Sequence, residues 1–431
     1  SMSMPQPNSR SVAGTSASNA LPPLPLPSLL LPPLTELPPL SLYVHIPWCL
    51  RKCPYCDFNS HAVPEGHALP AGRVVPIADA TPQDAALPES RYAEALLRDL
   101  EWALPQVWGR RVQSVFFGGG TPSLFSARTI ADLIAGFRAR LNLMPDCEIT
   151  LEANPGSFEL GKFRDFEAAG VNRLSLGIQS FDSSMLRALG RVHDGDEALR
   201  AANAAVEIFP RVNLDLMLAL PQQTLAQALA DARQALQIGA SHLSFYHLTL
   251  EPNTEFHRRP PALPDEDSAA AMQDAVAALL QEAGFAHYET SAWAQPGQQC
   301  RHNLNYWRFG DYLGIGAGAH AKISLPDRIL RQTRPRLPRD YMQQALAGTP
   351  MREQRELGRD ERVFEFMMNA LRLHEGFAVA EFVARTGLQI SVAQPALEKA
   401  EARGLIERDH VRIKATPLGR RFLNDLLEIF L

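Results

Sequence analysis

Three cysteines lie close together in the stretch C-L-R-K-C-P-Y-C-D-F. Cys49, Cys53 and Cys56 have the spacing C-x3-C-x2-C. Thiolate sulfur suits zinc, copper and iron–sulfur clusters. A structural zinc site needs a fourth ligand nearby, and none follows in the sequence. Three thiolates instead suit a cubane of four irons, in which one iron stays open for a small molecule.

The elements that must position this loop alternate between strand and helix patterns. Short apolar runs rich in β-branched and aromatic residues cover residues 41–46, 112–117, 148–152, 173–179, 212–218 and 242–249. Amphipathic segments of helix length separate these runs. This alternation predicts a parallel sheet, which could be an open doubly wound sheet or a partial barrel.

The residues that follow the predicted strands favour the barrel. Chemically active side chains or glycine turns stand at or near the end of each run, at Trp48 and Cys49, 118–122, Glu152, Gln179, Asp215 and His247. In a barrel of parallel strands, functional residues gather at the carboxyl ends of the strands. We therefore expect an α/β fold with a partial (β/α)6 TIM-type barrel.

The whole chain divides into three segments. Residues 1–40 are rich in proline and predict a disordered tail. Residues 41–325 would form the barrel, with a surface loop at 61–90 that is rich in proline and alanine. Residues 326–431 are mostly helical in pattern and end in two short β-like pieces and a helix. This pattern resembles a winged helix, for which docking is a better interpretation than DNA binding because no basic surface accompanies it.

Composition limits the class of protein. The chain has 431 residues, a formal net charge of −5, 46% hydrophobic residues and 21% charged residues, which is typical of a globular enzyme. Lysine and arginine residues form no continuous block, so nucleic acid is not expected as a partner. The sequence contains no run of about 18 apolar residues, so a transmembrane helix is not expected. The remaining cysteines, Cys147 and Cys300, are scattered, so a reducing, cytoplasmic location is expected.

The cysteine spacing, its place after the first strand, and Tyr55 before the last cysteine resemble the radical S-adenosylmethionine superfamily. The resemblance implies that Cys49, Cys53 and Cys56 bind a 4Fe-4S cluster whose open iron binds S-adenosylmethionine (SAM). It also implies a set of SAM contacts: Tyr43, Tyr55, Gly119, Gly120, Thr121, Glu152, Gln179, Arg191 and Asp215. Carboxylates suit ribose hydroxyls and an ammonium group, and a guanidinium suits the SAM carboxylate.

A narrower resemblance covers residues 42–431. Segments 43–60, 117–123, 151–156, 175–181, 300–307 and 314–320 resemble the oxygen-independent coproporphyrinogen III oxidase-like proteins, a subfamily that includes the haem chaperone HemW. This implies either radical decarboxylation of coproporphyrinogen III or delivery of haem to acceptor proteins. In the oxidase the motif continues to a fourth cysteine, where this chain has Phe58. The chaperone is therefore favoured, and a radical enzyme with another substrate stays open.

The stretch H-N-L-N-Y-W, residues 302–307, resembles the segment linked to haem binding in the HemW branch. The resemblance implies that haem is a ligand and that His302 binds its iron, since imidazole is a common axial ligand. The alternative is a hydrogen-bonded turn at the edge of the barrel. A membrane-associated haem acceptor would need a docking face, for which the C-terminal domain is the candidate. Five other side chains could line the cavity, but a core or rim role is as plausible for each: Tyr246, His247, His287, Tyr288 and His320.

Overall fold

One large mixed sheet organises the molecule. The computed structural model describes residues 31–49, 54–55, 61–62 and 87–431. Within this part of the chain, twelve strands hydrogen-bond in the order β14-β13-β12-β11-β1-β4-β5-β6-β7-β8-β10-β9. Its parallel strands are β1 (Leu40–Ile46), β4 (Arg111–Gly119), β5 (Asn142–Ala153), β6 (Arg173–Gln179), β7 (Arg211–Leu218), β8 (His242–His247) and β11 (Asp311–Ile315).

The six predicted strands are all present, so the partial (β/α)6 barrel is confirmed. Both faces of β6 and β7 are covered, and every residue of β6 is buried. This explains why these strands read as nearly continuous apolar runs. The sheet is open, because the described edge strands β9 (Ala286–Glu289) and β14 (Glu353–Glu356) do not pair with each other.

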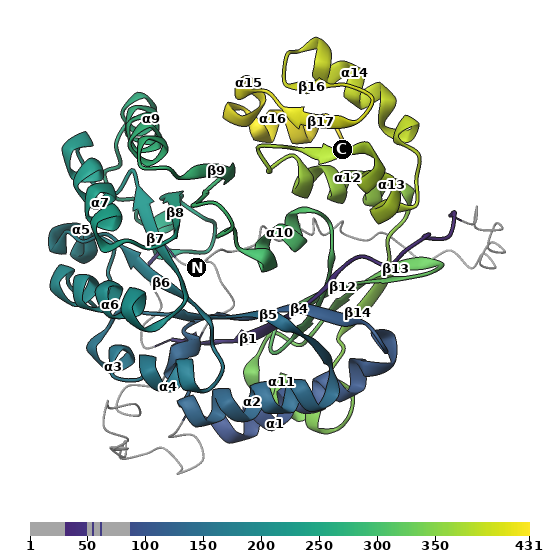
Figure 1. The fold of residues 1–431 in the computed structure, drawn as a ribbon, viewed down its shortest axis with the longest axis horizontal. Coiled ribbons are helices and arrows are strands. Elements are labelled where there is room, and N and C mark those ends of the chain that lie inside the picture. The colour runs from purple at the N-terminus through teal and green to yellow at the C-terminus, as the bar shows by residue number, and fades with distance from the viewer. Residues whose placement is uncertain (1–30, 50–53, 56–60, 63–86) are drawn as a thin grey trace.

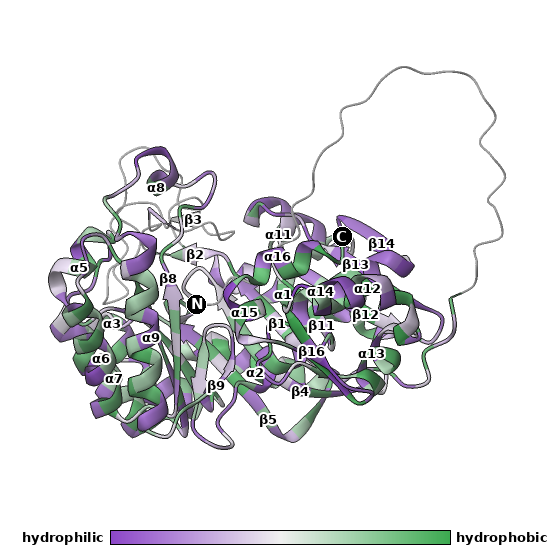
Figure 2. Ribbon diagram, turned by 90° about the horizontal axis from the view of Figure 1, so that it is seen from above, coloured by the Kyte–Doolittle hydropathy of each residue, from purple (hydrophilic) through white to green (hydrophobic). Residues whose placement is uncertain are grey.

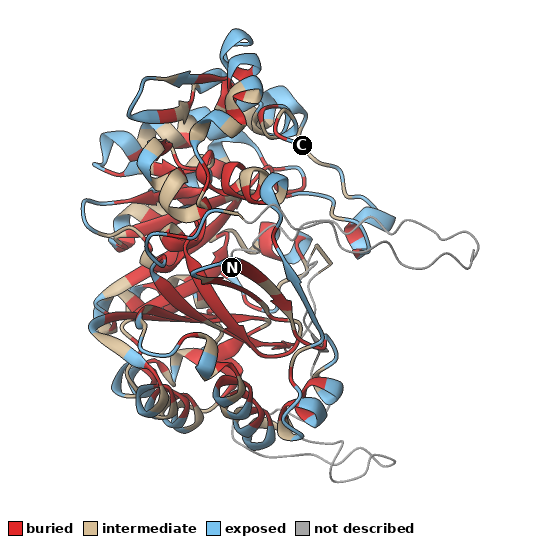
Figure 3. Cartoon of the chain, turned by 90° about the vertical axis from the view of Figure 1, so that its right-hand side faces the viewer, coloured by how far each residue is buried: buried red, intermediate tan, exposed pale blue. Residues whose placement is uncertain are grey.

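Helices cover the outer face of the barrel (Figure 1). They are α1 (Glu89–Ala103), α2 (Ala127–Arg140), α3 (Ser157–Leu160), α4 (Phe163–Ala168), α5 (Ser183–Ala188), α6 (Gly195–Ile208), α7 (Leu225–Ile238), α9 (Glu266–Glu282) and α11 (Pro338–Leu346). In Figure 2, α6 and α7 carry both apolar and polar residues. Their apolar faces pack on the strands, which are almost wholly buried in Figure 3.

Side-chain caps fix where several of these helices begin. The Ser126 hydroxyl accepts from the Thr129 amide before α2, and the Asp194 carboxylate accepts from the Glu197 amide before α6. Thr224 begins α7 with a complete capping box. Each cap satisfies an amide that has no partner within its own helix.

A buried ionic cluster fastens α1 to the strands that follow the barrel. The Asp99 carboxylate accepts from the Arg334 guanidinium at 3.1 Å and from the Tyr341 hydroxyl at 2.7 Å, and all three side chains are fully buried. Asp99 also accepts from the Gly316 amide at 3.2 Å. The cluster therefore joins α1, α11 and the turn that follows β11.

An antiparallel meander extends the sheet beyond β11. Its strands are β12 (His320–Leu325), β13 (Arg328–Thr333) and β14. At the other edge, β8 pairs with β10 (Ala292–Ala294), which pairs with β9. The described end of the proline-rich segment lies near the meander, where the Leu34 amide donates to the Pro326 carbonyl at 2.9 Å.

The C-terminal part has its own hydrophobic core, which includes Phe366, Phe377 and Phe382. It contains α12 (Arg359–Ala370), α13 (Val379–Thr386), α14 (Gln394–Ala402), α15 (Pro417–Arg421), α16 (Leu423–Glu428) and a small sheet of β15 (Phe377–Ala378), β16 (Ile406–Arg408) and β17 (Arg412–Ala415). Helices with a β16–β17 hairpin agree with the predicted winged-helix-like domain.

Several sequence predictions lie outside the described residues. These are residues 1–30 of the tail, Cys53, Cys56 and Phe58 of the cysteine loop, and residues 63–86 of the predicted surface loop. None of the helices in the described part is both long and apolar enough to cross a membrane.

Candidate cofactor-binding site

A glycine turn at the end of β4 lies tightly against the start of the cysteine loop. Gly119 has a φ of +118°, and a Cβ atom there would lie 2.6 Å from the Ile46 carbonyl oxygen. A Cβ atom at Gly120 would lie 2.5 Å from the Trp48 carbonyl oxygen. The amides of Gly120 and Thr121 donate to these two carbonyls at 2.8 and 2.6 Å. Only glycine lets the two segments approach so closely.

The described part of the cysteine loop faces the same place. Cys49 ends the short strand β2 (Trp48–Cys49), is 8% exposed and lines a large cavity at the carboxyl ends of the barrel strands. Tyr55 lines this cavity too, and its ring packs 6.2 Å from that of Phe256. Cys53 and Cys56 are not described, so the three-thiolate ligand set stays a prediction.

A chain of hydrogen bonds joins the predicted SAM contacts. The Arg191 guanidinium donates to the Asn154 side-chain oxygen at 3.0 Å and to the Tyr55 hydroxyl at 3.4 Å. The Asn154 amide group donates to the Thr121 hydroxyl at 3.1 Å. Asn154 was not predicted as a site residue, although it follows β5 and therefore stands at a strand end. It connects residues from three different loops.

Glu152 is a buried carboxylic acid in the cavity wall. Its side chain lies beside Gly118 and Tyr43, since a Cβ atom at Gly118 would be 3.0 Å from atoms of both. Burial raises the pKa of Glu152 to about 7 and also raises the pKa of Tyr43. A bound cation or hydroxyl donors would stabilise the ionised form of this carboxyl group.

Gln179 ends β6 with a φ of +66°, which is unusual for a residue with a side chain. It lines the cavity together with Gly177 and Arg191. A Cβ atom at Gly177 would lie 3.1 Å from the Gln179 side-chain nitrogen and 3.6 Å from the Arg191 guanidinium. The glycine therefore leaves room for both polar groups.

Two predicted SAM contacts, the half-buried Tyr43 and the buried Asp215, are not among the residues that line the cavity. The Tyr43 hydroxyl hydrogen-bonds to the His45 ring at 2.9 Å. Asp215 accepts from the Asn213 side chain at 2.8 Å, and Asn213 also donates to the cavity-lining Ser175 at 2.9 Å. Asp215 therefore lies one layer behind the cavity wall.

The 302–307 segment forms α10 (Arg301–Trp307), and His302 faces strand β4. The His302 ring stacks on Phe116 at 4.9 Å, and its Nδ1 atom hydrogen-bonds to the Ser114 hydroxyl at 2.8 Å. Burial lowers the pKa of His302 to about 4. His302 is absent from the cavity lining, whereas Trp307 contributes to it.

The Glu148 carboxylate holds the beginning of α10. It accepts from the amides of Arg301 and His302, each at 3.1 Å. Burial would raise the pKa of Glu148, but Arg173 and Arg211 lower it below its usual value. Cys300 is fully buried and its thiol pKa is raised to about 12 by burial, so this cysteine is a neutral core residue, as is the buried Cys147.

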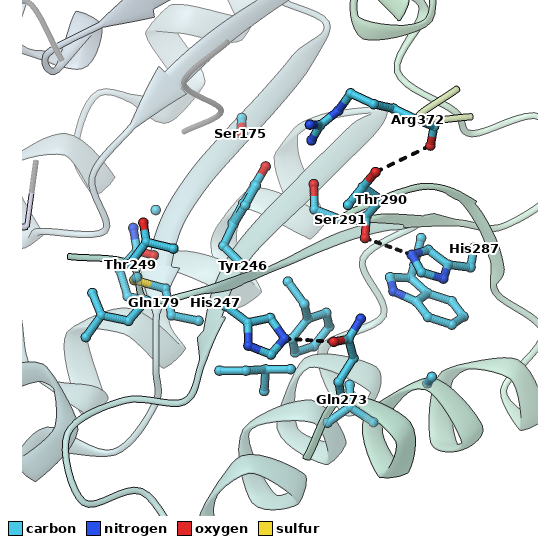
Figure 4. Close-up of a pocket in the computed structure, with 18 of the residues that line it drawn as sticks. Ser175, Gln179, Tyr246, His247, Thr249, Gln273, His287, Thr290, Ser291 and Arg372 are labelled. Carbon is cyan, nitrogen blue, oxygen red and sulfur yellow. Dashed lines mark hydrogen bonds between the residues drawn. The ribbon is translucent and has the colours of Figure 1, made fainter. Parts of the chain in front are cut away.

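The cavity has a volume of about 1290 Å³ and extends from the barrel to the C-terminal domain. In Figure 4, Gln179, His247 and Thr249 lie on one side of Tyr246, and His287, Thr290 and Arg372 lie on the other. Of the five side chains considered for the cavity, Tyr246, His247 and His287 line it, and Tyr288 and His320 do not. The side from the C-terminal domain was not predicted, because its residues are distant in sequence.

Comparison with known proteins identifies the family of this chain. The Radical SAM superfamily model matches residues 43–235, and the HemN C-terminal domain model matches residues 357–422. The heme chaperone HemW of Escherichia coli is 48% identical over 400 residues, which cover 92% of this chain and 100% of the relative. This chain belongs to the HemW family of radical SAM proteins.

Other relatives of the HemW family extend the same similarity. HemW of Haemophilus influenzae is 44% identical over 92% of this chain and 99% of its own length. The mouse mitochondrial radical S-adenosyl methionine domain-containing protein 1 is 36% identical over 90% of this chain and 86% of its own. The solved structure of the Escherichia coli coproporphyrinogen III oxidase HemN superposes with a TM-score of 0.74 over 91% of this chain and 90% of that one, at 23% identity. The last comparison shows a shared fold.

Membership of the radical SAM superfamily implies a 4Fe-4S cluster and SAM, and the described residues fit both. Cys49 offers a thiol to the cavity, the 118–120 glycines make room for a ligand against the backbone, and Arg191 offers a guanidinium. The cavity also holds a buried carboxyl group at Glu152. These donors suit sulfur-bound iron and an amino acid with a nucleoside attached.

Proposed function

We propose that this protein is a haem chaperone that holds haem in the cavity and passes it to acceptor proteins. The observation that carries the proposal is its similarity to HemW proteins across nearly the whole chain. The cavity supports it, since about 1290 Å³ exceeds the usual volume of about 300–1,000 Å³ for a small-molecule site. There is room for SAM and a further ligand.

The barrel end of the cavity is the proposed site of the cluster and SAM. Cys49, Cys53 and Cys56 would hold the cluster, whose open iron would bind the amino and carboxylate groups of SAM. Arg191 would donate to the SAM carboxylate, and Asn154 and Tyr55 would keep its guanidinium in place. Glu152 would accept hydrogen bonds from hydroxyl or ammonium groups of SAM. The glycine turn would let SAM lie close to backbone amides.

His302 stays a prediction as the haem ligand. Its low pKa leaves the ring neutral at physiological pH, and neutral imidazole is the form that binds metals. The hydrogen bond from Nδ1 to Ser114 leaves Nε2 for coordination. Ligation would however need haem to reach a ring that is 2% exposed and lies behind the cavity wall.

We further propose that the protein acts in the cytoplasm and that its acceptors include membrane-associated haem proteins. The C-terminal domain would dock them because it forms part of the cavity rim through Pro417, Arg421 and Asn424. Haem bound in the cavity would then lie close to the acceptor.

Titration of haemin into anaerobically reconstituted full-length protein tests the proposal. We expect a shifted Soret band that saturates at one haem per chain, and no loss of carboxyl groups when coproporphyrinogen III and SAM are added under reducing conditions. Decarboxylation without stoichiometric haem binding would identify an oxidase instead. Neither activity would indicate a radical enzyme with another substrate.

A further inference from the structure

The end of the cavity formed by the C-terminal domain is lined by aromatic, imidazole and guanidinium side chains. The histidines, tryptophans and arginines that line it include His287, Trp293, Trp307, Arg372, His374 and Arg420. They come from β9, β10, α10, the segment after α12 and α15. Flat aromatic rings beside imidazole and guanidinium groups suit a flat, metal-containing ligand with acidic substituents.

The His374 ring packs against the His287 ring, which other contacts hold in place. The His287 ring stacks on Trp293 at 4.1 Å with an interplanar angle of 8°, and its Nε2 atom donates to the Thr290 carbonyl at 3.0 Å. Figure 4 shows this hydrogen bond between His287 and Thr290. The His374 ring packs 3.9 Å from the His287 ring, at an angle of 52°. Stacking and the hydrogen bond therefore hold His287 in place.

His374 has the properties of a metal ligand. Its backbone is held by the hydrogen bond from its amide to the Tyr288 carbonyl at 3.1 Å. Its ring makes no hydrogen bond to any other residue in the described part of the chain, and it lines the cavity. Burial lowers the pKa of His374 to about 3, with His287 and Arg420 adding to the effect, so the ring is neutral and has a lone pair to donate.

Two donors in the lining of the same cavity lack hydrogen-bond partners among the described residues. The Arg372 guanidinium lies 4.5 Å from the Trp307 ring centre, and its Nε atom has no hydrogen-bond partner among the described residues. The indole nitrogen of Trp307, whose side chain is 3% exposed, also lacks a partner in that part of the chain. Buried donors without partners are costly, and a ligand with carboxylates would satisfy them. Glu289, the acidic neighbour of Arg372, makes no ion pair with it within 4.0 Å.

We propose that haem binds at this end of the cavity, with a ring nitrogen of His374 as the axial ligand of its iron and with Arg372 and Arg420 paired to its propionates. Trp307 and the His287–Trp293 stack would border the porphyrin. This inference rests on the proposed function, and it places the haem iron ligand on the C-terminal domain rather than on α10. SAM and haem would then occupy opposite ends of one cavity.

Axial ligation is tested by His374→Ala and His374→Gly in the full-length protein. We expect either change to weaken haemin binding at least tenfold and to remove the resonance Raman and electron paramagnetic resonance signals of an imidazole ligand. Added imidazole should restore these signals in His374→Gly, because it can fill the space left by the side chain. His302→Ala should keep the imidazole signals, and the exposed-site control His410→Ala should keep the whole wild-type spectrum.

The propionate contacts are tested by Arg372→Gln combined with Arg420→Gln. We expect wild-type protein to bind haemin at least tenfold more tightly than its dimethyl ester, and the double variant to lose this preference while keeping the imidazole signals. An equal preference in both proteins would overturn the assigned contacts.

The outcomes separate this inference from the proposed function. If His302→Ala removes the imidazole signals and His374→Ala keeps them, haem binds the chain but the ligand assigned here is wrong. If wild-type protein does not bind haemin at all, the proposed function itself fails. Cluster absorbance and SAM binding, measured in each variant, check that the barrel remains folded.

Discussion

A buried carboxyl group whose pKa is raised by burial should make stability depend on pH, and Glu152 is such a group. Its pKa of about 7 in the folded protein lies above the usual value of about 4.3 for a free glutamate. The folded protein therefore binds the proton more tightly, and stability is lost as pH rises through both values. We expect Glu152→Gln to be more stable than wild type by about 3 kcal/mol at pH 8 and nearly equal at pH 4.5.

Urea unfolding of cluster-free protein at several pH values measures this difference. Glu353→Gln on the exposed strand β14 is the control, and it should stay within about 0.5 kcal/mol of wild type at each pH. A constant difference between Glu152→Gln and wild type across this range would contradict the burial-induced shift.

The planar geometry of the Arg191 guanidinium should contribute to SAM binding as well as its charge. One terminal nitrogen of the guanidinium donates to Asn154 at 3.0 Å and the other donates to the Tyr55 hydroxyl at 3.4 Å, and lysine, which has a single nitrogen, cannot reproduce this geometry. We expect Arg191→Lys to lower SAM affinity about tenfold, as measured by anaerobic calorimetry on reconstituted protein. The control Arg187→Lys changes an exposed residue of α5 and should have no effect. Equal affinity in all three proteins would remove Arg191 from the proposed SAM site.

Residue types predicted much of the site, but sequence could not tell which side chains reach the cavity. Glu152 and Gln179 line it, as their strand-end positions suggested, and Arg191 lines it too, as the family resemblance implied. His302 and Trp307 are five residues apart on one short helix, and only the packing of α10 against β4 decides that His302 faces a strand and Trp307 faces the cavity. That packing depends on Glu148 and Ser114, which lie more than a hundred residues earlier.

At the scale of elements, the turn after β4 must be glycine for steric reasons. Gly119→Ala adds a Cβ atom 2.6 Å from the Ile46 carbonyl at a positive φ, whereas Gly109→Ala has a positive φ but open space around it. We expect Gly109→Ala to cost about 1 kcal/mol of unfolding free energy and Gly119→Ala at least twice as much. Gly119→Ala should also retain less iron after reconstitution. Equal losses in the two variants would show that the close contact is unimportant.

The buried attachment of α1 gives a second prediction at this scale. Asp99→Asn removes the charge partner of a fully buried Arg334, which should cost about 3–5 kcal/mol in urea unfolding. Glu101→Gln removes the partner of Arg140 in a partly exposed pair and should cost less than about 1 kcal/mol. A cost for Asp99→Asn as small as that for Glu101→Gln would mean that water reaches the cluster.

The elements themselves were predictable because each leaves a local pattern. The six barrel strands were found from short apolar runs, and β6 was predicted with its observed bounds. The seventh parallel strand, β11, and the antiparallel strands β12 to β14 were not, because their place in the sheet depends on pairing with β1, far away in the chain. Local pattern identifies a strand but not its distant partner.

At the scale of the whole molecule, the C-terminal domain completes a cavity that begins in the barrel. Arg372, His374 and Arg420 meet residues of β9 and β10 across this space, and no local signal predicts such a meeting. The arrangement brings a proposed carrier site close to the surface of the C-terminal domain.

The most direct test is transfer of haem from loaded full-length protein to a haem-deficient acceptor. Haem-loaded protein would be mixed with membranes from haem-starved cells that contain an inactive haem enzyme, and both the Soret band of the carrier and the enzyme's activity would be followed. We expect activity to return as the carrier loses haem, and faster than with an equal concentration of free haemin. Haem that stays on the carrier, or recovery no faster than with free haemin, would contradict a role in haem delivery.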